Sequence, residues 1–426
     1  ALGTASDRPV AEAFSTFLDQ NGVPQVTVAM SCGAGGAKLA LSQHRLAPLG
    51  APKNAGQRWQ VPVCVRYGDG AKTREACVLL SGESASLGLE GPCPKFVVAN
   101  AGGRGYYVAD YGDDLLARLS ANRSLLSPPE YAGLLYDLRA LVSAGSVSGA
   151  QALEWVRSAA GARNRHVAEA AIELALFIRD TLVGDAERAR FAAFVREVFG
   201  RRARTLGFSP RPGESDDDQL LRRSVIRFAA PEDRRLASEA RRLALAWIRD
   251  RNAVDSGMVD SVLLIAARTG DAKMFDAMLA EARKSSDSLD RRNLMVALLS
   301  FSDPILARRG LAVLLDPGFD IRESATALAV SRKSIPPRRE THEFIEANFD
   351  ALAQRVARDT PGSWSEYAAG LCSEKDRADV EAFWRGRVTK YEGGPRTLEQ
   401  TLEQIEMCAN LRSSQEASVA AFLPKH

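Results

Sequence analysis

The hydrophobic pattern of this chain changes its period once, near residue 113, and that change restricts the folds open to it. Before this point Val26, Val28 and Met30 alternate with small or polar residues. After it, apolar residues recur every three or four positions, as in the stripe that begins at Leu134. Period two indicates a half-buried strand and period 3.6 a one-sided helix. We therefore expect strands first and helices afterwards.

Residues 1–113 predict a small antiparallel β-sandwich. A second alternating run spans residues 59–67, and glycines at 33–36, 68–70 and 102–103 supply the turns between runs. Short strands at this spacing, with no helical segment between them, are typical of two packed antiparallel sheets. We take residues 1–113 as one domain.

Residues 114–426 predict a large irregular α-helical domain. Helix-start signals recur through it, for example Ser127-Pro128-Pro129-Glu130, where a capping side chain precedes prolines that fit the first turn. A segment of this length exceeds what one compact helical core usually serves, so stacked helix pairs are favoured over a bundle. We expect a HEAT/armadillo-like solenoid with a degenerate repeat, because no strict sequence period is present.

Charge and hydropathy exclude two classes of partner. The chain has 56 basic and 53 acidic residues, a net charge of +3. This near-balance gives no electrostatic reason to bind nucleic acid. No apolar run approaches the roughly 20 residues that cross a bilayer. We expect neither a nucleic-acid partner nor a membrane span.

The chain carries no recognisable catalytic motif. The nearest one is the segment His342–Glu346, which reads H-E-F-I-E. Zinc peptidases need H-E-x-x-H, because two imidazoles one helical turn apart must share a face. The alternative interpretation, favoured here, is a solvated helix start after Pro336-Pro337. Phosphate loops and nucleophile elbows are also absent from the sequence. We predict no catalytic residue, no metal ligand and no cofactor in this chain.

Two of the six cysteines lie symmetrically about a predicted hairpin turn. Cys64 and Cys77 are equidistant from the centre of the segment Gly68–Lys72. Residues that face each other across an antiparallel pair have Cβ atoms about 4.5–5.5 Å apart, near the range of a disulfide. We predict a bond here, with two free thiols as the alternative. Cys32 and Cys93 would then be the second pair of the β domain. Cys372 and Cys408 would be either a third pair or two buried thiols.

Four segments together resemble a known family. Residues 14–24 read F-S-T-F-L-D-Q-N-G-V-P, residues 59–63 read W-Q-V-P-V, and residues 100–107 read N-A-G-G-R-G-Y-Y, followed by Tyr111. Residues 396–405 read R-T-L-E-Q-T-L-E-Q-I. These resemble segments of the aminopeptidase N-like zinc aminopeptidases, the gluzincins, from the entry to their post-catalytic β-domain through the closing helix of their C-terminal domain.

The resemblance implies a part of such an enzyme that lacks the catalytic machinery. Neither the G-x-M-E-N strand nor the H-E-x-x-H helix of that family occurs in the sequence. We therefore expect the C-terminal half of a zinc aminopeptidase, inactive alone, with the zinc held in the absent catalytic domain. In the parent enzyme, the resemblance implies, the helical domain encloses a chamber for peptides and the β-domain braces the catalytic domain. Val108 stands where the family usually has arginine, so any ion pair of that arginine is missing.

One residue is a candidate for substrate binding. Arg396 follows Pro395 in the segment that resembles the closing helix. Our hypothesis is that Arg396 holds a peptide carboxylate in the chamber, since the guanidinium fork suits a carboxylate. The alternative is a structural arginine paired with Glu399 or Glu403.

Two broader questions stay open at this point. The alternative to part of an aminopeptidase is a protein of a different functional class, a stand-alone solenoid adaptor with a β-sandwich module. The predicted disulfide favours a periplasmic or extracellular parent enzyme, with the cytoplasm as the alternative.

Overall fold

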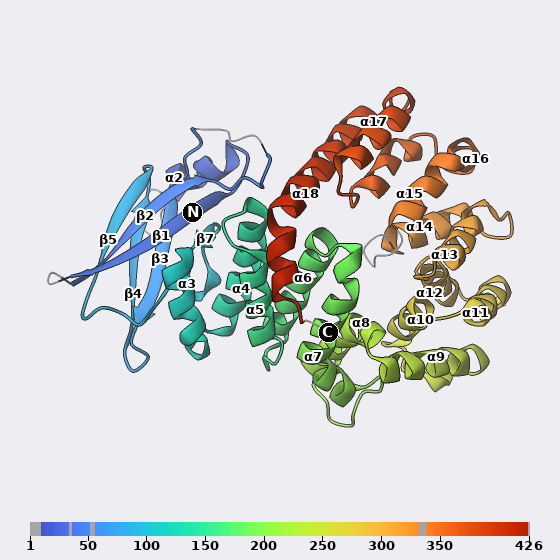
Figure 1. Cartoon of the computed structure of the whole chain (residues 1–426), viewed down its shortest axis with the longest axis horizontal. Helices are drawn as coiled ribbons and strands as arrows, with labels where there is room; N and C mark the ends of the chain where they lie inside the picture. Colours follow the sequence, from blue (N-terminus) through green and yellow to red (C-terminus); the bar gives the residue numbers. More distant parts are fainter. Residues whose placement is uncertain (1–9, 34–35, 52–55, 332–337, 425–426) are drawn as a thin grey trace. The chain divides into compact units, whose positions relative to one another are not determined.

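The computed structural model describes residues 10–33, 36–51, 56–331 and 338–424 (Figure 1). Its contacts divide the chain into two compact units. Unit 1 comprises residues 1–177 with 417–421, and unit 2 comprises residues 178–416 with 422–426. Helices account for most of the described residues, after a small β region. Among the described helices, none is both long enough and apolar enough to cross a membrane.

In the described part of unit 1, seven strands form two sheets. They are β1 (Pro24–Gly33), β2 (Gly36–Arg45), β3 (Val61–Gly68), β4 (Thr73–Leu80), β5 (Ser84–Leu89), β6 (Phe96–Val98) and β7 (Val108–Asp110). One sheet has the order β5-β2-β1-β7 and the other the order β4-β3-β6. Alternate residues of β2 and β3 are buried, as the period of two predicts.

A buried glutamine joins the two sheets. The side-chain nitrogen of Gln43, on β2, donates to the carbonyl oxygens of Trp59 (2.7 Å) and Leu80 (3.2 Å), and its side-chain oxygen accepts from the Trp59 amide at 3.0 Å. Gln43 is only 3% exposed. These bonds satisfy polar groups that would otherwise be costly to bury.

Two features of the β region differ from the sequence prediction. β7 pairs with β1 in parallel, with Gln25 opposite Val108, so a wholly antiparallel arrangement is wrong for this pair. The physical reason is the connection: the chain passes through β6 in the other sheet before it reaches β7, and a crossover of this kind permits parallel pairing. A helix also precedes the strands, α2 (Val10–Leu18), and none of its residues is buried.

The remaining helices of unit 1 follow the strands directly. They are α3 (Gly112–Ala121), α4 (Pro128–Ala144), α5 (Gly149–Ala159) and the first part of α6 (Arg165–Leu182), with short 3₁₀ turns η1 (Ala101–Gly103) and η2 (Arg123–Leu125). α4 begins at the predicted signal, where Ser127 and Glu130 form a reciprocal capping box. It ends at Gly145, whose φ of 78° lies in the left-handed region that favours glycine. The contacts group these helices with the strands in unit 1. The domain boundary at residues 113/114 stays a prediction.

Unit 2 consists almost entirely of helices. They are α7 (Arg188–Leu206), α8 (Asp216–Ala229), α9 (Arg234–Arg249), α10 (Val259–Arg268), α11 (Ala272–Lys284), α12 (Ser288–Leu298), α13 (Pro304–Leu311), α14 (Ile321–Ser331), α15 (Arg338–Ala347), α16 (Phe349–Ala353), α17 (Glu374–Val388) and α18 (Gly394–Phe422). Between them lie the 3₁₀ turns η3 (Asp185–Glu187), η4 (Ala230–Glu232), η5 (Arg251–Ala253), η6 (Ala312–Leu315) and η7 (Thr360–Ala368). Four helices begin after an aspartate whose carboxylate accepts from the first-turn amides: Asp233, Asp271, Asp287 and Asp303.

Neighbouring helices of unit 2 pack mainly on partners one or two positions away in the chain. α10 contacts α8, α9 and α12, and α12 contacts α11, α13 and α14. This local packing is compatible with a stacked array, but the HEAT-like character stays a prediction.

The last helix departs from this local pattern. Near its C-terminal end, Phe422 packs edge-on against Phe194 of α7 at 5.9 Å between ring centroids. Arg190 donates to the carbonyl oxygens of Leu423 (2.6 Å) and Pro424 (3.0 Å). Within unit 2, the end of the helical array thus returns to its beginning.

Candidate functional site

The helices of unit 2 surround a cavity of about 590 Å³. Segments from α6, α7, α10, α15, α17 and α18 contribute to its walls. Charged side chains dominate the lining. The arginines are Arg179, Arg188, Arg268, Arg338, Arg339 and Arg412, and the carboxylates are Asp180, Asp185, Glu232, Glu340 and Asp376. A cavity with this lining favours a polar, charged ligand over an apolar one.

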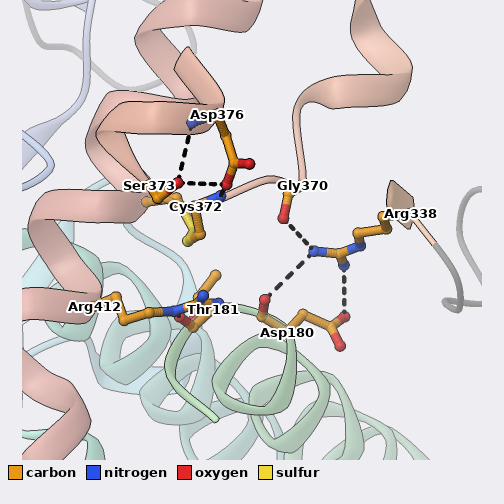
Figure 2. The surroundings of a disulfide bond; sticks show 9 residues. Asp180, Thr181, Arg338, Gly370, Cys372, Ser373, Asp376 and Arg412 are labelled. Atoms are coloured by element: carbon orange, nitrogen blue, oxygen red, sulfur yellow. Dashed lines mark hydrogen bonds and ion pairs between the residues drawn. A yellow bond between two sulfur atoms is a disulfide. The ribbon is translucent and has the colours of Figure 1, made fainter. Parts of the chain in front are cut away.

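Arg338 connects two walls of the cavity (Figure 2). Its Nη1 donates to the carbonyl oxygens of Gly370 at 3.1 Å and Asp180 at 3.4 Å, and its Nη2 lies 3.5 Å from the Asp180 carboxylate. Burial lowers the pKa of Arg338, the Asp180 charge opposes this, and the nearby Arg179 and Arg412 lower it further. The arginines therefore lie close enough to repel one another.

Arg412 enters the cavity from α18. Its Nε donates to the carbonyl oxygen of Thr181, at the end of α6, at 2.9 Å (Figure 2). Within the described part of the chain, no carboxylate forms an ion pair with Arg412. A cation near the C-terminal carbonyls of a helix is favourable, yet this contact uses only one of five guanidinium donors.

Arg268 is the arginine of this cavity whose charge and donors have the weakest partners among the described residues. It is the last residue of α10, and its side chain is 13% exposed. The nearest carboxylate oxygen, Glu232 Oε1, lies 3.8 Å away, and the Nε of Arg268 is buried without a hydrogen-bond partner among the described residues. Burial lowers the pKa of Arg268 to about 10, and the charge of Arg179 lowers it as well.

A disulfide fixes one wall of the cavity. Cys372, in the segment before α17, is bonded to Cys408 on α18 (Figure 2). Beside it, Asp376 accepts from Ser373 Oγ at 2.6 Å and pairs with Arg339 at 2.7 Å. Burial raises the pKa of Asp376, but these two partners outweigh burial, so the pKa lies below its usual range. The disulfide thus ties this segment to the helix that carries Arg412.

Arg396, the sequence candidate, lies away from the cavity. It is exposed in the first turn of α18 and is not among the residues that line the cavity. Its proposed partner Glu399 pairs instead with Arg385, at 2.9 Å. The role of Arg396 in binding a peptide carboxylate stays a prediction.

His342 is buried, so the expectation of a solvated helix start is wrong at this position. It is 5% exposed, and its Nε2 accepts a hydrogen bond from Trp384 Nε1 at 3.1 Å. Burial lowers the pKa of His342 to about 4, which keeps the ring neutral at pH 7. Glu346 Oε1 lies 3.3 Å from the same nitrogen. Among the described residues, no three His, Cys, Asp or Glu side chains are grouped so as to hold a metal ion.

All six cysteines form disulfides. Cys64 and Cys77 lie directly opposite each other in the β3–β4 register, with Cα atoms 4.1 Å apart. Cys32 is bonded to Cys93 at a Cα separation of 5.7 Å.

Sequence reasoning did not single out the arginines of the cavity. Arg179, Arg268, Arg338 and Arg412 belong to four helices and are far apart in the chain. Arginines of this kind are common on solvated helix faces. No local sequence signal distinguishes the four from the many others.

Comparisons with known proteins place the chain in a family. Residues 96–407 match the family model described as ERAP1-like C-terminal domain. The chain is 25% identical to the puromycin-sensitive aminopeptidase of Caenorhabditis elegans, over 84% of this chain and 37% of that protein. It is 24% identical to the alanine/arginine aminopeptidase of Saccharomyces cerevisiae, over 100% of this chain and 50% of that protein.

A third relative gives the same result. The chain is 25% identical to aminopeptidase M1 of Arabidopsis thaliana, over 96% of this chain and 48% of that protein. The chain thus spans half or less of the length of these three relatives. It belongs to the ERAP1-like C-terminal domain family and is the C-terminal part of an aminopeptidase N-like enzyme.

Proposed function

We propose that this chain is the non-catalytic C-terminal region of a zinc-dependent aminopeptidase that removes N-terminal residues from peptides. In this proposal it braces the catalytic domain and encloses part of the peptide-binding chamber. Each of the three relatives above is named an aminopeptidase and extends well beyond the matched part. A stand-alone adaptor finds no support among them.

The observation that carries the chamber proposal is the cavity within unit 2. Its walls come from helices throughout the unit, and α18 returns to α7 through Phe422 and Arg190. A helical array that closes on itself leaves a recess with polar walls, which admits a flexible peptide and excludes a folded protein. We propose that the array is a HEAT-like solenoid whose inner face bounds the chamber.

The exposed face of α2 supports association with a catalytic domain. Phe14 is 56% exposed and Leu18 68% exposed, while Phe17 contacts Tyr106, which is itself 69% exposed. Grouped apolar side chains of this kind mark interaction sites. In the proposal, the catalytic domain covers this face. The catalytic domain, and not this chain, binds the zinc.

Compartment is a further part of the proposal. Three disulfides, two in the β region and one in unit 2, suit a periplasmic or extracellular enzyme. A cytoplasmic enzyme remains the alternative, in which these cysteines would be reduced thiols. Peptide mapping without reductant on protein from its native compartment separates the two.

The test of the proposal uses the reading frame around this chain. We expect an H-E-x-x-H motif upstream of it, zinc-dependent hydrolysis of alanyl or leucyl anilides by the complete protein, and none by this chain alone. Chelator-sensitive hydrolysis by this chain alone would contradict the assignment of the zinc site elsewhere.

The docking face has its own test. Phe14→Ser with Leu18→Ser should weaken binding of this chain to a separately produced catalytic domain, measured by analytical ultracentrifugation. Leu289→Ser, at a position 57% exposed in unit 2, is the matched control and should leave binding unchanged. Equal effects of the two changes would refute the role of α2.

A further inference from the structure

We propose that the arginine-lined cavity of unit 2 binds a small ligand through its phosphate group. This inference goes beyond the proposed function, because it assigns to the arginine-lined part of the same cavity a second ligand that is neither a peptide nor a metal ion.

Four arginines from four helices meet in this cavity. Arg179 comes from the end of α6, Arg268 from α10, Arg338 from α15 and Arg412 from α18. The charge of Arg179 lowers the pKa of both Arg268 and Arg338. The charge of Arg412 also lowers the pKa of Arg338. These pairs of arginines repel each other across the shared cavity, and an anion between them relieves the repulsion.

The carboxylates of the cavity neutralise the positive charge of these four arginines only in part. Arg188 and Arg339 have partners of their own, Asp185 at 2.8 Å and Asp376 at 2.7 Å. Asp180 is divided between two arginines, at 2.8 Å from Arg179 and 3.5 Å from Arg338.

The other two of the four arginines, Arg268 and Arg412, have weaker charge partners. Glu232 stays 3.8 Å from Arg268, beyond hydrogen-bond distance, and Arg412 has only a carbonyl partner. Glu340 also lines the cavity, where its charge acts on Arg339. The positive charge without a close partner therefore lies on Arg268 and Arg412.

Unused donors point to the same ligand. Arg268 Nε has no hydrogen-bond partner among the described residues although it is buried. Among the described residues, Arg412 donates through Nε alone, and Arg338 only through its two terminal nitrogens. Unpaired donors are costly, so a ligand that accepts from the terminal nitrogens of Arg412 gains affinity, whereas Arg268 Nε lies out of reach of solvent and contributes mainly its charge.

The arrangement favours a phosphate over a carboxylate. Planar carboxylates offer two oxygens to one guanidinium fork, whereas a phosphate offers oxygens in several directions and carries up to two charges. Arginines that approach from separate helices suit the second geometry. The cavity, at about 590 Å³, has room for a small organic group attached to the phosphate. Inorganic phosphate and a phosphate monoester are the two sources of this chemistry.

A purely structural role makes a different prediction. Arg338 and Arg412 accept no ligand in that case and simply hold the last carbonyls of α6 against α15 and α18. Their removal would then lower stability without any effect of phosphate. The experiment below separates the two roles and uses no peptidase assay, so its failure would leave the proposed function untouched.

The test is calorimetric titration of the intact, oxidised chain with inorganic phosphate, glycerol phosphate and acetate at constant ionic strength and neutral pH. We expect saturable binding of at least one phosphate compound and a matching rise in melting temperature, with acetate at least about tenfold weaker. Tighter binding of glycerol phosphate identifies a monoester as the source, and equal binding identifies phosphate itself. No saturable binding, or acetate that binds equally well, would overturn the proposal.

Variants assign the binding to the cavity. Arg268→Met should weaken phosphate binding at least about tenfold. Arg268→Lys keeps the charge without the fork, and should also weaken binding; it replaces the methionine variant if that protein does not melt cooperatively. Arg283→Met, which removes an exposed arginine paired with Asp316 outside the cavity, should bind like wild type. Unchanged affinity in a folded Arg268 variant would refute the site.

Discussion

Glu130→Gln should destabilise unit 1 strongly, because Glu130 is the buried acceptor that joins β3 to α4. It is 4% exposed. Its two oxygens accept from Arg66 at 2.8 and 2.6 Å, from the Ser127 amide at 2.9 Å and from the Gly102 amide at 3.1 Å. Burial raises the pKa of Glu130, but Arg66 and the two amides outweigh it and hold the pKa at about 2.

The magnitude follows from this pKa. Folding lowers it from 4.5 to about 2, and each unit corresponds to about 1.4 kcal/mol. The ionised carboxylate therefore contributes up to about 3 kcal/mol above pH 4.5, and this contribution is lost as the pH falls towards 2. Glutamine keeps one acceptor oxygen but leaves Arg66 without its counter-charge. We expect a loss of about 2–4 kcal/mol at pH 7.

The assay is urea unfolding of the intact chain at pH 7 and pH 3, with limited proteolysis of residues 96–144 to assign the transition to unit 1. The difference between wild type and variant should shrink by roughly half at pH 3. Asp114→Asn is the matched control, since its exposed i,i+4 pair with Arg118 at 3.0 Å should contribute less than about 0.5 kcal/mol. A loss in Glu130→Gln no larger than in the control, or one independent of pH, would refute the reasoning.

Three further predictions concern buried carboxyls and a disulfide. Burial, with smaller effects of nearby carboxylates, raises the pKa of Glu346 to about 7. The wild type should therefore lose stability as the pH rises from 4.5 to 7, and Glu346→Gln should not. Equal melting temperatures of both proteins at pH 8 would contradict this. Burial likewise raises the pKa of Asp137 to about 8, although it accepts from the Ala109 amide at 3.2 Å. Asp137→Asn should therefore melt higher than wild type at pH 9 and alike at pH 4, and the reverse order would exclude the buried carboxyl as the cause. Replacing both Cys372 and Cys408 by serine should cost about 3–4 kcal/mol by the loop-closure estimate, measured as urea unfolding of unit 2, and unchanged stability would show that the bond adds nothing.

Local features of the fold could be predicted from the sequence because local interactions determine them. Periodicity places β1, β2 and β3, and Ser127 with Glu130 marks the start of α4. The parallel partner of β1 could not be predicted, since pairing through a crossover leaves no trace in the alternation of either strand. The helix α2 is also absent from the expectation for residues 1–113, and none of its residues is buried.

The candidate site depends on distant residues. Arg268 and Arg412 are separated by most of unit 2, and only the return of α18 brings both to one cavity. Arg396 had the stronger sequence argument, because a recognisable segment surrounds it, yet it lies at the exposed start of the same helix. Similarity to a family motif indicates which helix a residue belongs to, but not which way its side chain faces.

The return of α18 also affects how the protein is made. Contacts between Arg190 and Pro424, and between Thr181 and Arg412, join residues more than 230 positions apart. During synthesis the first helices of unit 2 leave the ribosome long before their partners do. Until then the faces of α6 and α7 that these contacts cover lie open to chaperones and to other nascent chains. Closure is therefore a late step, and one whose loop-closure entropy slows folding.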